Sequence, residues 1–335
     1  MTTSSNFPTE RDEHPFAPYV RILGKGKRGS RSLTETEAFE AMSMILDGQV
    51  LDLQLGAFLM LLRVKEESPE EIAGFVRACR ERLQPPSDLV ADLDWSSYAG
   101  KRRHLPWFLL AALLLGRNGI RVFMHGASGH TQGRVYTESV VRQLGLAVAT
   151  DWNDARSALQ TTGFCYMPLS ALNRRLHDII QMRSILGLRS PVHSLVRLLN
   201  PLDAPAVLQG IFHPSYSEIH QQAASLLGYS NVTVIKGEGG EIERNPDARL
   251  LARTIVQGEL QEEEWPPLSE LRHLKPETLS LEQLTAVWNG ESTDSYGERA
   301  VIGTLAIALK GLGRATSQED ALRSAQAMWD QRSAL

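Results

Sequence analysis

The sequence predicts an α/β protein in which a small N-terminal helical domain precedes a larger α/β domain with a central, mostly parallel sheet. Two observations predict this class. The first 85 residues carry helix-start signals and apolar residues at helical spacing, whereas short apolar segments alternate with helical stretches from about residue 105 onward. Alternating strands and helices are typical of a parallel sheet covered by helices.

The helical region is defined by two repeated start signals. Thr34 and Glu37 have the spacing of a capping box, and an apolar helical pattern follows them. Ser68 and Glu71 repeat the device, with a proline at the first helical position and an apolar stripe from residue 72 to residue 83. Paired prolines at 85 and 86 end this region.

The larger region shows four short apolar segments that we interpret as buried strands. They span residues 120–124, 163–167, 207–212 and 232–236. Helical stretches at 105–115, 172–186 and 215–227 are interleaved with them. This order favours parallel strands joined by helical crossovers.

Composition points to a soluble cytoplasmic protein without a membrane partner. Cys79 and Cys165 are far apart in apolar surroundings, so we interpret them as buried thiols and not as a disulfide. The N-terminal residues are polar and lack an apolar signal core. The longest apolar run, 105–115, is far shorter than the ~20 residues of a membrane span.

Charge is segregated along the chain. Residues 95–202 hold 13 Lys+Arg against 4 Asp+Glu, a balance of +9, although the whole chain has a net charge of -4. Residues 95–137 contain no acidic residue and include a glycine-rich loop at 124–133. A positive field beside flexible backbone indicates an anionic ligand, unless the arginines pair with the acidic parts of the chain in the fold.

Several colinear segments resemble the anthranilate phosphoribosyltransferase family. They are residues 33–38, 54–65 and 68–78, then His125-Gly126, 182–190, 199–202 and 208–212. The resemblance covers roughly residues 18–330. It implies a helical domain that dimerises, joined to an α/β domain. Together with this resemblance, the apolar stripes at 55–62 and 72–83 suggest a symmetric dimer through these helices. Accordingly we expect residues 1–17 to be a flexible N-terminus, residues 18–85 and about 172–198 to form the helical dimerisation domain, and residues 86–171 and 199–335 to form the α/β domain.

The motifs that carry catalysis in this family are altered. Where the enzymes have Gly-Thr-Gly-Gly-Asp, whose amides cradle the pyrophosphate of phosphoribosyl pyrophosphate, this chain has Ser97-Tyr-Ala-Gly-Lys101 followed by Arg102 and Arg103. The adjacent Asp-Glu pair that holds magnesium is replaced by a loop with Glu238, Glu241 and Glu243. We therefore expect no catalytic residue, no metal and no cofactor. Gly100, His125, Gly126 and Arg183 are then a vestigial phosphate or substrate site.

The replacements themselves resemble the YbiB-type branch of the family, which is associated with nucleic-acid binding. The resemblance implies a homodimer that binds DNA or RNA without base specificity. Point charges in place of a glycine cradle suit a polyanion. The candidate binding residues are basic side chains in three segments: Lys25, Lys27 and Arg28; Lys101, Arg102 and Arg103; and Arg174, Arg175, Arg183 and Arg189.

Two other functions remain open at this point. The chain is alternatively a divergent phosphoribosyltransferase that uses phosphoribosyl pyrophosphate and magnesium, or a scaffold whose basic surface binds an acidic partner. Arg175 and Arg183, eight residues apart, are expected on one helix face. Four aromatic residues either stack bases or belong to the core: Trp95, Tyr98, Trp107 and Phe108.

Overall fold

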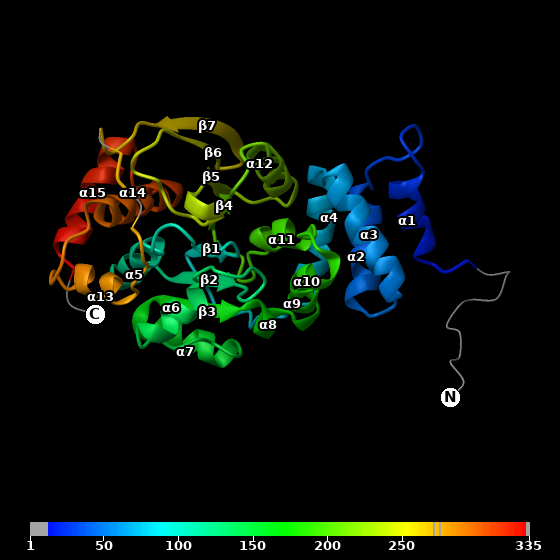
Figure 1. Ribbon diagram of the computed structural model, residues 1–335, viewed down its shortest axis with the longest axis horizontal. Helices are drawn as coiled ribbons and strands as arrows, with labels where there is room; N and C mark the ends of the chain where they lie inside the picture. Colours follow the sequence, from blue (N-terminus) through cyan, green and yellow to red (C-terminus); the bar gives the residue numbers. More distant parts are fainter. Residues whose placement is uncertain (1–12, 271, 275, 333–335) are drawn as a thin grey trace.

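The computed structural model describes residues 13–270, 272–274 and 276–332. Most of the N-terminus that we expect to be flexible, residues 1–12, lies outside the described residues. A small group of helices stands at one end of the molecule, and a sheet with helices on both faces forms the rest (Figure 1). The predicted combination of a helical domain and a larger α/β domain is confirmed.

Four helices make up the N-terminal part: α1 (Ala17–Gly24), α2 (Glu35–Leu46), α3 (Asp52–Lys65) and α4 (Pro69–Arg80). Both predicted capping boxes are present, because Thr34 caps α2 with Glu37 and Ser68 caps α4 with Glu71. Helices α2 and α4 pack closely: a Cβ on Gly74 would lie 2.2 Å from the carbonyl oxygen of Glu35. Only glycine permits this approach.

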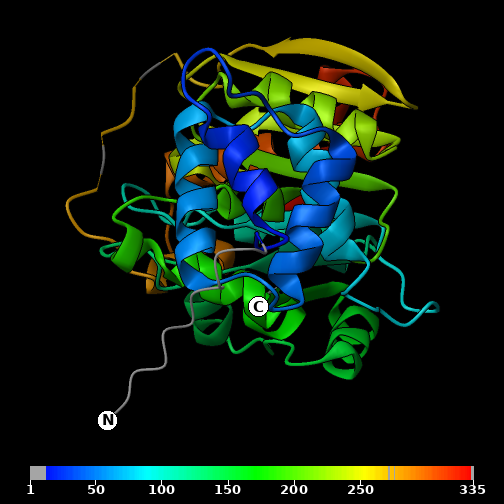
Figure 2. The same cartoon turned by 90° about the vertical axis from the view of Figure 1, so that its right-hand side faces the viewer.

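The chain returns to these helices after β3. Short helix α8 (Leu169–Leu172) follows β3 directly. Helices α9 (Arg174–Gln181), α10 (Arg183–Leu186) and α11 (Val192–Leu195) lie beside α2, α3 and α4, and η1 (Val196–Leu198) then leads back to the sheet (Figures 1 and 2). The single helix expected over 172–186 is interrupted at Asn173, whose side chain caps α9, and again at Met182. We call the segment from Leu188 to Leu198 the hinge.

A seven-stranded sheet organises the larger part, in the order β3-β2-β1-β4-β5-β6-β7. The strands are β1 (Leu93–Ser97), β2 (Val122–Gly126), β3 (Phe164–Pro168), β4 (Ala206–Ile211), β5 (Asn231–Lys236), β6 (Leu250–Val256) and β7 (Glu259–Trp265). Strands β1 to β5 are parallel, while β6 and β7 run antiparallel to their neighbours. The four predicted strands are confirmed within two residues; β1, β6 and β7 were not predicted as strands.

Helices cover both faces of the sheet. They are α5 (Phe108–Arg117), α6 (Thr137–Gln143), α7 (Trp152–Thr162), α12 (Tyr216–Leu226), α13 (Glu282–Trp288), α14 (Ser295–Gly311) and α15 (Gln318–Asp330). Successive side chains of a strand point to opposite faces of the sheet, so the sheet separates two hydrophobic cores. In β2, for example, Phe123 belongs to one core and Val122 to the other. The first core continues without a break into the helical end.

The aromatic residues near β1 belong to these cores. Trp95, Tyr98, Trp107 and Phe108 are all buried, so none of them offers a ring face for stacking to a nucleic-acid base. Within the described ranges, no helix has the length and apolar character that crossing a membrane requires.

Candidate functional site

The carboxyl ends of the parallel strands meet at one edge of the sheet, the edge at which α/β proteins place their ligand sites. Three loops cover it: residues 98–103 after β1, residues 127–135 after β2, and residues 237–243 after β5, which include η2 (Glu238–Gly240). The hinge approaches the same edge, because Arg197 donates hydrogen bonds to the carbonyl oxygens of Gly210 and Gly240.

In the 98–103 loop, which corresponds to the pyrophosphate-binding loop of the enzymes, the backbone N–H groups already bind a carboxylate of the protein. The backbone N–H groups of Ala99 and Gly100 both donate to one oxygen of Glu241, at 2.6 and 2.5 Å. Glu241 is completely buried. Arg134 secures the other side of the loop by donating to the carbonyl oxygens of Ala99 and Gly100. The amide cradle therefore already holds an anion and does not fit a diphosphate.

Lys101 is placed differently from our expectation. Its ammonium group is buried and lies 2.5 Å from a carboxylate oxygen of Glu238 and 2.5 Å from one of Glu243. Burial acts to lower the pKa of Lys101, but the charges of the two glutamates outweigh it and raise that pKa. A buried ammonium that is paired with two carboxylates is not available to a phosphate. Lys101 is therefore not a nucleic-acid contact, contrary to our expectation.

The same arrangement determines whether a divalent cation fits. The ammonium of Lys101 lies between the carboxylates of Glu238 and Glu243. One oxygen of Glu241 accepts from two backbone N–H groups, and its other, buried oxygen has no hydrogen-bond partner among the described residues. Among the described residues, no group of three His, Cys, Asp or Glu side chains is arranged to hold a metal ion. These residues do not fit the magnesium ion that the family resemblance implies.

His125 and Gly126 lie inside the sheet. The Nδ1 atom of His125 is 2.6 Å from the hydroxyl of Tyr98, and its Nε2 atom is 3.4 Å from Asp94. The side chain is completely buried. A Cβ on Gly126 would lie 2.1 Å from the carbonyl oxygen of Ser97, so this glycine is required for the close approach of β1 and β2.

Four arginines converge where the hinge meets the 127–135 loop: Arg134, Arg183, Arg189 and Arg197. None of them makes an ion pair within 4 Å among the described residues. Arg183 donates to the carbonyl oxygen of His130 and to the hydroxyl of Thr131. Burial, then the charges of Arg134, Arg197 and Arg183, lower the pKa of Arg189 to about 10. We call this set the arginine cluster; the charge of Glu241 acts on Arg197 from beyond ion-pair distance.

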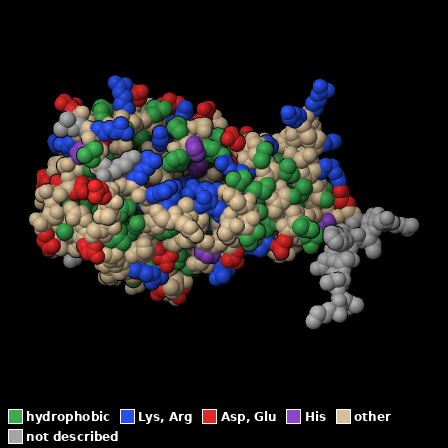
Figure 3. Space-filling model, in the orientation of Figure 1, with side chains coloured by type: hydrophobic (Ala, Val, Ile, Leu, Met, Phe, Trp, Pro, Cys, Tyr) green, Lys and Arg blue, Asp and Glu red, His purple; other side chains and the backbone are tan. Residues whose placement is uncertain are grey.

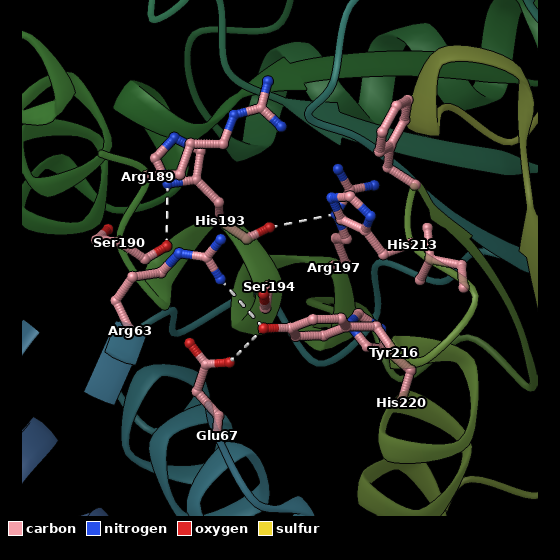
Figure 4. A pocket seen from close by; sticks show the side chains of 12 residues that line it. Arg63, Glu67, Arg189, Ser190, His193, Ser194, Arg197, His213, Tyr216 and His220 are labelled. Atoms are coloured by element: carbon pink, nitrogen blue, oxygen red, sulfur yellow. Dashed lines mark hydrogen bonds between the residues drawn. The ribbon is translucent and has the colours of Figure 1, made fainter. Parts of the chain in front are cut away.

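A cleft opens beside the arginine cluster, between α3, the hinge and the segment after β4 (Figure 4). We call it the hinge cleft; its volume is about 120 Å³. Arg63, Arg189 and Arg197 line it together with Glu67. Burial raises the pKa of Glu67, the only carboxylate among the lining residues. Three arginines against this one glutamate give the lining an excess of positive charge.

Two buried polar atoms at the hinge cleft have no partner among the described residues. They are the hydroxyl of Ser190 and Nε2 of His193, whose residues are 4% and 6% exposed. Burial, followed by the nearby charges of His130 and Arg189, lowers the pKa of His193 well below its ordinary value. The hydroxyl of Ser190 can donate a hydrogen bond to an oxygen-rich ligand. Nδ1 of His193 donates to the carbonyl oxygen of Ser190, so Nε2 of the neutral ring is an acceptor and does not donate to such a ligand.

The remaining predicted basic residues do not join the arginine cluster. Arg102 and Arg103 are exposed on the 98–103 loop. Arg174 pairs with Asp178 on the surface of α9. Arg175 is directed to the carbonyl oxygen of Ile45, so it does not share a face with Arg183 as we expected. Lys25, Lys27 and Arg28 are exposed between α1 and α2, at the far end of the helical domain (Figure 1).

Sequence reasoning missed several residues of the site: Arg63, Arg134 and Arg197 near the hinge, Glu241 in the amide cradle, and Phe212 beyond β4. The sequence did contain a pattern that could have identified Arg134, because this residue lies in the acid-free stretch 95–137. No sequence pattern identifies Arg197, because it follows an apolar helical segment and its hydrogen-bond partners come from β4 and η2, farther along the chain.

The chain contains the two parts of one glycosyl transferase family. Residues 18–83 match the helical bundle domain of that family, and residues 108–335 match its a/b domain. The chain belongs to this family.

Individual relatives cover most of the chain. An uncharacterized protein of Aquifex aeolicus (strain VF5) is 30% identical over 72% of this chain and 73% of its own length. The uncharacterized protein YbiB of Escherichia coli (strain K12) is 27% identical over 86% and 88%. The crystal structure of anthranilate phosphoribosyltransferase from Thermus thermophilus superposes with a TM-score of 0.78 and 21% identity, covering 95% of this chain and 94% of that one. The last comparison establishes a shared fold.

Proposed function

We propose that this protein binds DNA or RNA through backbone phosphates, without base specificity, on a phosphoribosyltransferase fold that does not carry out phosphoribosyl transfer. One observation carries the proposal: among the described residues no carboxylate lies within 4 Å of the arginine cluster, while the amide cradle beside it is filled by Glu241. The carboxyl ends of the strands thus carry positive charge but offer no amide site for a diphosphate.

The distribution of charge favours a polymer over a small anion. Lys and Arg side chains gather in the middle of the face in Figure 3, beside a histidine. Arg102 and Arg103, the two exposed residues of the 98–103 loop, add to this charge. Several phosphates along one chain can engage such a surface at the same time, and each neutralised phosphate releases counterions. Phosphate contacts of this kind position a nucleic acid without reading its bases.

The enzymatic alternative has less support. A transferase that uses phosphoribosyl pyrophosphate and magnesium needs free amides after β1 and free carboxylates after β5. Here the amides of Ala99 and Gly100 bind Glu241, and Glu238 and Glu243 bind Lys101. An acidic protein partner, the third candidate, would lack the regular charge spacing that gives nucleic acids their salt dependence.

We also propose a homodimer, on a different surface from the one expected. Most apolar residues of 55–62 and 72–83 are buried inside the protomer, and Met60 and Leu61 pack partly buried against its core, so these stripes are not free to form an interface. Instead, large apolar side chains are exposed on α3 and around α10: Leu53, Val64, Ile185 and Leu188. Helices α3 and α10 are neighbours, because Gly56 faces Leu186. Exposed apolar residues on adjacent helices favour a protein interface.

Fluorescence anisotropy with labelled DNA and RNA oligonucleotides tests the binding proposal. Replacing Arg183 and Arg189 by glutamine should weaken binding of every sequence by a similar factor. The control is Arg323→Gln, which removes an exposed arginine on α15, and it should leave affinity unchanged. If the double variant binds as tightly as the unmodified protein, the arginine cluster is not the binding site.

A further inference from the structure

Phe212 is an exposed aromatic residue at the strand ends. It directly follows β4, and 52% of its surface is accessible. Its ring meets His213 edge-on, with ring centroids 4.9 Å apart and an interplanar angle of 86°. His213 is therefore not stacked parallel to the phenyl ring, and about half of the surface of Phe212 is open to solvent.

Phe212 forms a shared wall between two basic clefts. On one side is the hinge cleft, lined by Arg63, Arg189 and Arg197. On the other side is a cleft of about 400 Å³ to which Arg103, Lys236 and Arg249 contribute; we call it the outer cleft. Ile211 and Phe212 are the residues that line both.

The charges of the outer cleft are mostly free of internal partners. Arg103 and Lys236 make no ion pair within 4 Å in the described part of the chain, and Glu238 in the same cleft is paired with Lys101. Arg249 lies 3.9 Å from Glu264, but both side chains are more than 70% exposed, so this pair is weak. Like the hinge cleft, the outer cleft suits a phosphate.

From this arrangement we propose that the protein prefers single-stranded nucleic acid, with phosphates in the hinge cleft and the outer cleft and an unpaired base stacked on Phe212. The inference rests on the proposed nucleic-acid binding and adds the form of the partner. A duplex keeps its bases stacked on each other and offers no free base face, whereas a single strand offers one at every nucleotide. The buried hydroxyl of Ser190, which has no partner among the described residues, gives the hinge-cleft phosphate a hydrogen-bond donor.

Comparison of Phe212→Ala with the unmodified protein tests this inference. Single-strand affinity should fall by about 5- to 150-fold, the range that one stacked base contributes. Affinity for a duplex of the same sequence should change by less than about twofold, because no charge is altered and duplex bases do not stack on protein rings. Phe212→Tyr should keep the single-strand affinity. Leu260→Ala, which removes another exposed apolar side chain on β7, should behave as the unmodified protein.

A single strand with abasic sites provides an independent arm. The abasic strand should bind the unmodified protein more weakly than the intact strand does. Its affinity should not fall further for Phe212→Ala, because the base that would stack on Phe212 is already absent. Equal losses for single strand and duplex, or no loss for either, would overturn the role of Phe212 while leaving phosphate binding intact. If the unmodified protein binds neither nucleic acid, the proposed function itself fails and this inference falls with it.

Discussion

The ammonium nitrogen of Lys101 lies 2.5 Å from a carboxylate oxygen of Glu243, and both side chains are completely buried. The other oxygen of Glu243 accepts a hydrogen bond from the backbone N–H of Phe108, at the start of α5. One ion pair therefore ties the loop after β1 to the loop after β5. This pairing separates Lys101 from Arg102 and Arg103, which remain in solvent.

Loss of this buried cation should destabilise the fold. Replacing Lys101 by alanine leaves Glu238 and Glu243 without their partner, and breaking a buried pair in this way costs about 3–5 kcal/mol. Urea denaturation followed by circular dichroism measures the free energy of unfolding. Arg102→Ala, which changes an exposed neighbour, should stay within about 0.5 kcal/mol of the unmodified protein. A loss below about 1 kcal/mol for Lys101→Ala would contradict the buried pairing.

The parent reaction of the fold family should not occur. Because Glu241 fills the amide cradle and Lys101 lies between Glu238 and Glu243, we expect no phosphoribosyl anthranilate to form from anthranilate and phosphoribosyl pyrophosphate with magnesium. The decrease in anthranilate fluorescence gives a direct assay. Steady-state turnover proportional to the concentration of this protein would support the enzymatic alternative instead.

Stability should fall on mild acidification because of His130. Burial and the charge of Arg189 lower its pKa from 6.5 to about 4 in the folded protein. The unfolded chain therefore binds a proton below about pH 6.5 that the folded protein does not. The stabilisation is present above about pH 6.5 and is lost progressively as the pH falls toward 4. For His130 alone, the free energy of unfolding should drop by about 2 kcal/mol between roughly pH 7.5 and pH 5.

Urea titrations at these two pH values, with His130→Gln as the comparison, isolate this contribution. Glutamine cannot take up a proton, yet its amide can donate to the carbonyl oxygen of Tyr98, as Nε2 of His130 does. The variant should lose less stability than the unmodified protein over the same interval. An identical pH dependence for both proteins would show that His130 is not held neutral.

Dimerisation should depend on the exposed apolar residues of α3 and α10. Light scattering at micromolar concentration should give a dimer mass for the unmodified protein. Leu53→Glu combined with Ile185→Glu should give monomers that remain folded, because both side chains are largely exposed in the protomer. A monomer mass for the unmodified protein would remove the proposed interface.

Elements with strong local patterns were predictable from the sequence. The capping boxes at Thr34 and Ser68 specify helix starts through neighbouring residues alone. Strand β1 was harder, because Asp94, Ser96 and Ser97 are polar and yet buried. Strand β7 is exposed along most of its length, so it has no apolar alternation to reveal it.

The site was less predictable than the fold. Lys101 and Arg102 are neighbours with the same charge, and their opposite placement depends on glutamates that lie far along the chain, after β5. The convergence of Arg134, Arg189 and Arg197 likewise depends on how the hinge folds against the strand ends. Sequence patterns report local structure, whereas these relationships are tertiary.

The salt dependence of nucleic-acid affinity tests the central claim most directly. The logarithm of the association constant should fall linearly with the logarithm of salt concentration, with a slope of about 0.9 per neutralised phosphate for duplex or roughly 0.7 for single strands. Strands of unrelated sequence should give the same line within error. Replacing Arg102, Arg103, Arg183 and Arg189 by glutamine should make the line shallower by roughly one unit for each phosphate contact removed. An affinity that does not respond to salt, or a slope unchanged by these substitutions, would contradict phosphate binding at this surface.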